Sequence, residues 1–235
     1  MIRKALLIAA LALPLPAFAQ AYQCRAPQRI DMPQPPRPDG PRRDTPITGY
    51  TLAISWSPEF CRGGKAAKDP ANYQCNSAIG RFGFVLHGLW PESTPGKYPQ
   101  WCSLTPRPTE AELKANMCMT PVPWLLEHEW AKHGSCMAKT PAAYFQKSQA
   151  MWRAVRLPDA DRLSRQPNLT AGDLRRAFVA LNPRFPVGSV GIRTGNGGWL
   201  REVQLCYDRK FVPTPCDRAK FGPKNDVPLN IWRGL

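Results

Sequence analysis

The three histidines of this 235-residue chain are confined to two short segments. One segment is FVLHGLWP at 84–91, which contains His87, and the other is HEWAKHG at 128–134. An α-helix turns by about 100° per residue. A helix over the second segment would therefore place four polar side chains on one side, opposite Leu126 and Trp130. These four are His128, Glu129, Lys132 and His133.

These side chains include two or three imidazoles, an ammonium group and a carboxylate, but no evident nucleophile. Such a set suits the cleavage of RNA by its own 2′-hydroxyl. One group takes the 2′ proton, another protonates the departing 5′ oxygen, and cations stabilise the charge that spreads around phosphorus. Histidine suits both proton transfers because its ordinary pKa lies near neutral pH. DNA lacks the 2′-hydroxyl, so we expect it to bind such a site without being cut.

Two other classes of function compete with this interpretation. A helix that carries His-Glu is also found in zinc hydrolases, but those place two histidines four residues apart. His128 and His133 are five apart and splayed by about 140° on a helix, and no cysteine pair has the Cys-x-x-Cys spacing of structural zinc sites. We therefore expect no metal and no cofactor. The second alternative, a noncatalytic binder of polyanions, predicts RNA binding without cleavage.

The composition fits a folded protein that attracts phosphate. There are 32 Lys and Arg against 17 Asp and Glu, a formal net charge of +15, which excludes a typical acidic cytosolic protein. Hydrophobic residues make up 43% of the chain, enough to bury a core. The 27 prolines and 17 glycines argue against a helical bundle or a coiled coil.

The N-terminus has the three parts of a secretory signal peptide, which we assign to residues 1–19. A basic start with Arg3 and Lys4 precedes an apolar run that is too short to span a bilayer, and a small-x-small site ends at Ala19. Cleavage after Ala21 is an alternative. Export to the periplasm or out of the cell predicts an oxidising compartment, and the even number of cysteines, eight, agrees with a disulfide framework.

Residues 20–48 form a segment rich in proline and arginine that cannot fold by itself. We interpret it as an extended, basic N-terminal arm, pinned at one point by Cys24. A plain solvated linker is the favoured interpretation of this arm, and an auxiliary polyanion-binding arm is the alternative.

Residues 49–235 are expected to form a single α+β domain with a central antiparallel sheet. Alternating or β-rich runs predict strands at 49–56, 81–87, 191–194 and 200–207. Helices are predicted at Thr109–Met117, Trp124–His133, Thr140–Arg156 and Thr170–Leu181. Gly88 and Pro91 are expected to break the second strand and so leave His87 at its exposed end.

The two histidine segments, HGLWP at 87–91 and HEWAKHGSC at 128–136, resemble the active-site motifs of the ribonuclease T2 family. The resemblance extends from about Tyr50 to Cys136 and more vaguely to Cys216, and it leaves out the arm. It implies an α+β fold with a central antiparallel sheet flanked by helices. It also implies metal-independent endonucleolytic cleavage of single-stranded RNA, through a 2′,3′-cyclic phosphate and with little base specificity. We expect RNA as the only partner, no membrane association and a monomer.

The resemblance also implies a role for each motif residue. His133 would be the general base and His87 the general acid, an assignment that is reversible in principle because each serves the opposite step in hydrolysis of the cyclic phosphate. His128 would bind the phosphate. Lys132 would stabilise the transition state by its charge, and Glu129 by orienting or polarising its neighbours.

The main base pocket of the family corresponds here to Trp90, Glu92 and Tyr98, and its aromatic stacking predicts weak selectivity. Short loops favour two disulfides, and the family pairs the cysteine that closes the second motif with one downstream of the first, most simply Cys102. One pair is then left over. The expected disulfides are Cys61–Cys75, Cys206–Cys216, Cys102–Cys136 and Cys24–Cys118.

Overall fold

The computed structural model describes residues 24–64, 68–94 and 97–234. The expected signal peptide at 1–19, and both of its expected cleavage sites, lie outside the described residues. Within them, no helix is both long enough and apolar enough to cross a lipid bilayer.

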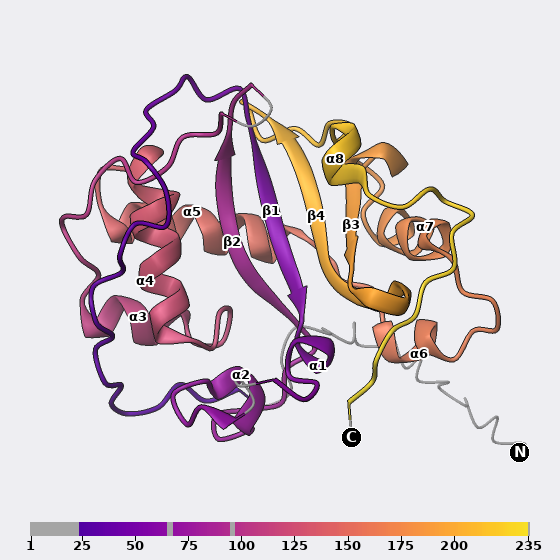
Figure 1. Ribbon diagram of the computed structural model, residues 1–235, viewed down its shortest axis with the longest axis horizontal. Coiled ribbons are helices and arrows are strands. Elements are labelled where there is room, and N and C mark those ends of the chain that lie inside the picture. The colour runs from indigo at the N-terminus through magenta and orange to yellow at the C-terminus, as the bar shows by residue number, and fades with distance from the viewer. Residues whose placement is uncertain (1–23, 65–67, 95–96, 235) are drawn as a thin grey trace, which may run out of the picture.

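A four-stranded antiparallel sheet forms the centre of the molecule, in the spatial order β2-β1-β4-β3 (Figure 1). Its strands are β1 Gly49–Trp56, β2 Phe84–Glu92, β3 Val190–Thr194 and β4 Leu200–Asp208. The predicted fold class is therefore confirmed. Strands β2 and β3 are the edges of the sheet, while β1 and β4 are paired on both sides.

Helices flank the sheet at both edges and behind it (Figure 1). Helices α3 and α4 lie beside β2, α7 and α8 lie beside β3, and α5 passes behind the strands. The helices are α1 Ser57–Phe60, α2 Tyr73–Asn76, α3 Glu110–Asn116, α4 Pro123–Lys132, α5 Pro141–Ala154, α6 Ala160–Ser164, α7 Ala171–Leu181 and α8 Arg218–Phe221. Single 3₁₀ turns lie at Gly134–Cys136, Val187–Ser189 and Asn196–Gly198.

The predicted helices correspond to α3, α4, α5 and α7, with ends that differ by at most two residues. Thr109 and Thr170 each form a capping box with the acidic residue three positions later, as the sequence pattern indicates. The strand predicted at 81–87 is wrong at both ends, because β2 runs from Phe84 to Glu92. His87 therefore lies within the strand and not at its end.

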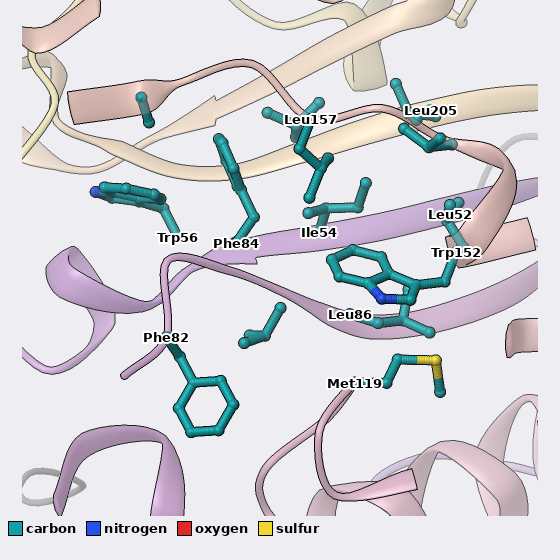
Figure 2. Packing of buried hydrophobic residues seen from close by; sticks show 14 of the residues in the cluster. Leu52, Ile54, Trp56, Phe82, Phe84, Leu86, Met119, Trp152, Leu157 and Leu205 are labelled. Carbon is teal, nitrogen blue, oxygen red and sulfur yellow. The ribbon is translucent and has the colours of Figure 1, made fainter. Parts of the chain in front are cut away.

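The core lies on one face of the sheet, where alternate strand residues are apolar. Leu52 and Ile54 of β1 and Leu205 of β4 are fully buried, in one cluster with Leu86 of β2 and Trp152 of α5 (Figure 2). Burying each such side chain contributes about 1.5–3 kcal/mol. Because side chains alternate along a strand, the intervening positions are left free to build a polar site on the opposite face.

The described part of the arm, residues 24–48, packs against the body of the protein. Figure 1 shows it running across α3 and α4 to the start of β1. Ile30 belongs to the buried core, and the backbones of Arg43 and Gln100 exchange two hydrogen bonds of 2.9 Å. The interpretation of these residues as a solvated linker is therefore wrong. Contacts with the folded domain hold the arm in place, and the composition of the arm alone does not reveal these contacts.

Four disulfides close the fold, and the described residues contain no free cysteine. The pairs are those expected from the sequence: Cys24–Cys118, Cys61–Cys75, Cys102–Cys136 and Cys206–Cys216. The first pair fixes the beginning of the arm to the end of α3, and the third ties the end of the second histidine segment to the loop before α3.

Candidate active site

A cavity of about 440 Å³ opens on the polar side of the sheet, between α4 and α8. The eight residues predicted to bind or cleave a substrate all line it, although they come from three separate stretches of the chain. They are His87, Trp90, Glu92, Tyr98, His128, Glu129, Lys132 and His133. The structure therefore brings together every side chain that the sequence singled out for chemistry.

A β-bulge presents His87 to the cavity. In the pairing of β1 with β2, Ala53 lies opposite Gly88 and Ile54 opposite Leu86, so His87 is the extra residue. A bulge turns a side chain away from the regular alternation of the strand. The bulge therefore lets His87 and Trp90, three residues apart, both face the polar side and line the cavity, with one third of the His87 side chain exposed.

Gly88 is required because two site residues approach its backbone. A Cβ atom at this position would lie 2.0 Å from Glu129 Oε2 and 2.6 Å from Trp90 Nε1. Those two atoms are joined by a hydrogen bond of 2.6 Å that the indole donates to the carboxylate. The glycine of the first motif therefore lets α4 and β2 come close enough to link Trp90 to Glu129.

Helix α4 supplies the second motif. It begins at Pro123, a position where the missing N–H costs no helical bond. Leu126 and Trp130 are buried on one side, and the Trp130 indole donates to the Pro106 carbonyl oxygen at 2.8 Å. That anchored side holds the opposite side, with its histidines and Lys132, over the cavity, as the helical spacing predicts.

Two carboxylates surround His87. Its Nδ1 lies 2.7 Å from Glu202 Oε2, and its Nε2 lies 3.6 Å from Glu129 Oε1. Burial by itself would lower the pKa of His87, but the hydrogen bond to Glu202 and the charge of Glu129 outweigh it and raise the pKa to about 9. The two carboxylates therefore favour the imidazolium form of His87 at neutral pH.

His133 has the opposite electrostatic surroundings. Burial and the nearby Lys132 ammonium hold the pKa of His133 well below its usual range. Its Nδ1 is buried and has no hydrogen-bond partner among the residues that the structure describes. Protonation would bury an unpaired N–H as well as a charge, so the neutral imidazole is favoured.

His128 is also neutral, and it is held between aromatic rings. Its ring stacks on Trp124 at a centroid distance of 5.0 Å and meets the edge of Trp101 at 5.3 Å. Burial and the charge of Lys132 lower the pKa of His128 to about 4. A neutral imidazole in this position can offer one N–H to an anionic oxygen.

Glu129 is almost fully buried, and burial raises its pKa to about 7 in spite of the nearby His87 charge and the Trp90 hydrogen bond. Its two oxygens face different partners, Trp90 and His87. Glu129 therefore connects the end of β2 to the imidazole of the bulge and fixes the position of both rings.

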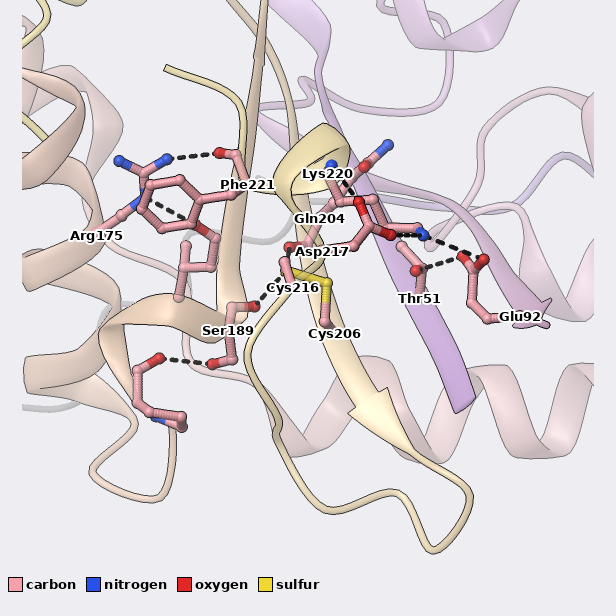
Figure 3. The surroundings of a disulfide bond; sticks show 12 residues. Thr51, Glu92, Arg175, Ser189, Gln204, Cys206, Cys216, Asp217, Lys220 and Phe221 are labelled. Atoms are coloured by element: carbon pink, nitrogen blue, oxygen red, sulfur yellow. Dashed lines mark hydrogen bonds and ion pairs between the residues drawn. A yellow bond between two sulfur atoms is a disulfide. The ribbon is translucent and has the colours of Figure 1, made fainter. Parts of the chain in front are cut away.

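The pocket predicted to hold a base has polar partners from β1 and α8. Thr51 donates its hydroxyl to Glu92 Oε1 at 2.6 Å, and Lys220 Nζ lies 3.2 Å from Glu92 Oε2 (Figure 3). Lys220 also pairs with Asp217 at 2.6 Å. Trp90 and Tyr98 supply the aromatic surfaces, each with its ring centroid within 6.0 Å of that of His133.

A second cavity, of about 690 Å³, adjoins the first. Both are lined by His87 and Arg193, and the second continues to Trp124 and Leu125. Half of the Trp124 side chain is exposed, so an aromatic surface is available there too. His87 therefore stands where the two cavities meet.

Charged partners of three predicted site residues were not found from the sequence: Glu202 beside His87, Asp39 beside Lys132, and Lys220 beside Glu92. Each comes from a segment far from the two motifs, and none lies in a recognisable pattern. Glu202 reaches the site through the register of β4 against β1, Asp39 through the path of the arm, and Lys220 through the docking of α8. No group of three or more metal-binding side chains is arranged to hold an ion in the described part of the chain.

The fold and the cavity define a class of protein: a disulfide-stapled α+β domain whose cleft combines imidazoles of opposite protonation state with a lysine. Residues 48–171 match the model of the Ribonuclease T2 family, and the chain belongs to this family. The predicted resemblance is thereby confirmed, and the arm precedes the matched residues.

Named relatives agree with this membership. A probable ribonuclease of Haemophilus influenzae is 30% identical over 187 residues, which cover 75% of this chain and 64% of that protein. Intracellular ribonuclease LX of Solanum lycopersicum is 35% identical over 169 residues, which cover 62% of this chain and 70% of that protein. The crystal structure of RNase NT in complex with 5′-AMP has the same fold, with a TM-score of 0.61 at 19% identity, over 80% of this chain and 98% of that one.

Proposed function

We propose that this protein is a metal-independent endoribonuclease that cleaves single-stranded RNA by transphosphorylation through 2′,3′-cyclic phosphates. The observation that carries the proposal is the opposite surroundings of two histidines in one cavity. His87 lies between two carboxylates, which raise its pKa and suit it to donate a proton. His133 is buried near the Lys132 ammonium, which lowers its pKa and suits it to accept one. Acid–base cleavage at neutral pH needs one group of each kind.

In the proposed mechanism, His133 removes the proton of the 2′-hydroxyl, whose oxygen then attacks the adjacent phosphorus. His87 protonates the 5′ oxygen as the P–O5′ bond breaks, which leaves a 2′,3′-cyclic phosphate and a free 5′-hydroxyl. His128 donates an N–H to the phosphate, and the Lys132 ammonium stabilises the charge that develops on its oxygens. Glu129 orients His87. In hydrolysis of the cyclic phosphate the two proton-transfer roles are exchanged.

The two adjoining cavities support cleavage within a strand. A phosphodiester at His87 would have room for a nucleotide on each side, with Trp90 and Tyr98 in one cavity and Trp124 in the other. Aromatic rings stack on any base, so little base specificity is expected. Four disulfides agree with a periplasmic or secreted protein, and we propose that it acts there as a monomer.

The experiment that tests this proposal is digestion of a short RNA by the oxidised protein in excess EDTA, with the 3′ ends of the products identified by mass. We expect 2′,3′-cyclic phosphates. A His133→Ala variant should be slower by about 10²-fold or more, and DNA of the same sequence should stay intact. RNA that is bound but not cut would overturn the proposal in favour of a noncatalytic polyanion binder.

A further inference from the structure

The arm contacts the Lys132 ammonium group, which in the proposed function stabilises the negative charge of the transition state. Lys132 Nζ lies 2.6 Å from Asp39 Oδ2, and the other oxygen of the carboxylate, Oδ1, accepts a hydrogen bond of 3.0 Å from the Trp101 indole. The Lys132 side chain is 15% exposed and that of Asp39 52%. The carboxylate therefore reaches the lysine from the solvent side, and an indole fixes its direction.

The segment that includes Asp39 is itself held in place. The Gln100 side chain donates to the Pro41 carbonyl oxygen at 2.8 Å, and the backbone of Arg43 pairs with that of Gln100. The next residue, Trp101, donates its backbone N–H to the Lys132 carbonyl oxygen at 2.8 Å. Gln100 and Trp101 thus connect the arm to Lys132. Gln100 holds the arm, and Trp101 contacts both the Lys132 backbone and the carboxylate that pairs with the Lys132 side chain.

Asp39 contacts Lys132 but does not itself line the cavity. Lys132 lines the cavity, whereas none of the described lining residues belongs to the arm. One N–H of the Lys132 ammonium is directed at Asp39, so two N–H groups are left for a phosphate in the cavity.

We propose that Asp39 is a positioning residue that holds the Lys132 ammonium in its catalytic direction, so that the arm forms part of the catalytic apparatus. This inference rests on the proposed function. A lysine side chain has four rotatable bonds and loses much freedom when it is fixed. If a carboxylate fixes the lysine side chain before substrate arrives, less conformational freedom has to be lost during the reaction. Preorganised charges have this effect in general.

The Asp39 carboxylate is half-exposed, and an ion pair that water reaches in this way contributes little to folding stability. Removal of the Asp39 charge should therefore change kcat much more than it changes thermal stability. This difference separates a positioning role from a merely structural one.

The test is a double-mutant cycle in RNA cleavage, with the wild-type protein, Asp39→Asn, Lys132→Ala and the double variant. We expect Asp39→Asn to lower kcat about tenfold while KM stays within about twofold. In the Lys132→Ala background the same change should have a much smaller effect on kcat, measured at a pH where His128 and His133 are both neutral, because Asp39 then acts only by its charge, which raises the pKa of these two histidines. Asp39→Glu should recover part of the lost kcat.

Asp44→Asn is the matched control, since Asp44 is an exposed carboxylate of the same arm. It removes the same charge and should leave kcat unchanged. If Asp39→Asn kept or raised kcat, or lost the same factor in both backgrounds, the inference would be overturned while the proposed function stood. If the wild-type protein itself failed to cleave RNA, both would be overturned.

Discussion

His87 and His133 show how one residue type acquires two states within a single cavity. Glu202 and Glu129 supply negative charge on either side of His87, whereas His133 is buried beside Lys132. The first environment favours the imidazolium and the second the neutral ring. The neighbouring charges therefore decide which histidine is the proposed acid and which is the proposed base. The shorter of the two contacts to His87, that of Glu202, can be removed by mutation.

A Glu202→Gln variant should change the pH dependence of kcat/KM on its alkaline side. In the wild-type protein, activity should rise at low pH as His133 loses its proton, and fall near pH 9 as His87 loses its own. Without the Glu202 charge the pKa of His87 falls, so the alkaline limb should move down by about one unit or more. The measurement is a pH profile with a dinucleotide substrate.

Asp226→Asn serves as the control for that experiment, because Asp226 is an exposed carboxylate that does not line the cavity. Its alkaline limb should coincide with that of the wild type. An alkaline limb that stayed in place in Glu202→Gln would show that another group donates the proton.

Sequence reasoning found the residues that lie in motifs and missed their charged partners. His87, Glu129 and Lys132 belong to short motifs, and the residue spacing of these motifs alone indicates a function. Glu202 is a single acid in a strand, and Asp39 is one of several polar residues in a proline-rich arm. Their significance depends on contacts across 115 and 93 residues of chain, respectively, which local patterns do not record.

At the scale of elements, strand β2 explains why the prediction for His87 was wrong. Gly88 and Pro91 indicate a strand end in isolation, but β2 lies at the edge of the sheet, where a missing N–H costs no ladder bond if it faces outward. The glycine accommodates Glu129, so it serves the site without ending the strand. Helices α1, α2, α6 and α8 have four or five residues each, too short for an apolar period to mark them.

Helix α8 forms one wall of the cavity, and its position depends on a buried arginine of α7. Arg175 is fully buried and donates to the Phe221 carbonyl oxygen at 2.6 Å (Figure 3). It also donates to the Val190 carbonyl oxygen at 2.8 Å and to Asn225 Oδ1 at 2.7 Å. Its guanidinium also stacks 3.7 Å from the Phe221 ring centroid. One side chain thus joins α7, β3 and the end of α8.

An Arg175→Met variant should lower the free energy of unfolding by about 3 kcal/mol, since it leaves three acceptors without their donor. Arg176→Met is the matched control. Arg176 is 64% exposed and pairs only with Asp173 among the described residues, so its loss should cost at most about 0.5 kcal/mol. Urea denaturation measures both values. Equal losses in the two variants would contradict the role assigned to the buried arginine.

For the whole molecule, the excess of positive charge should govern the capture of substrate. The formal net charge of +15 favours binding of a polyanion through release of its counterions. We expect kcat/KM on a long RNA to fall at least tenfold between about 50 and 200 mM salt. A dinucleotide, which has a single phosphodiester, should lose much less over the same range. A flat profile for the long RNA would show that the charge does not serve capture.

The order of the cysteines has a consequence for how the protein is made. Cys24 is the first cysteine of the chain and pairs with the fifth, Cys118, while the Cys102–Cys136 bond straddles that link. A chain that enters an oxidising compartment from its N-terminus presents Cys61 to Cys24 long before Cys118 emerges. A Cys24–Cys61 bond formed at that stage would have to be exchanged for the native pairs. We therefore expect the reduced protein to regain its native disulfides in higher yield with a redox couple that reshuffles disulfides than with an oxidant alone.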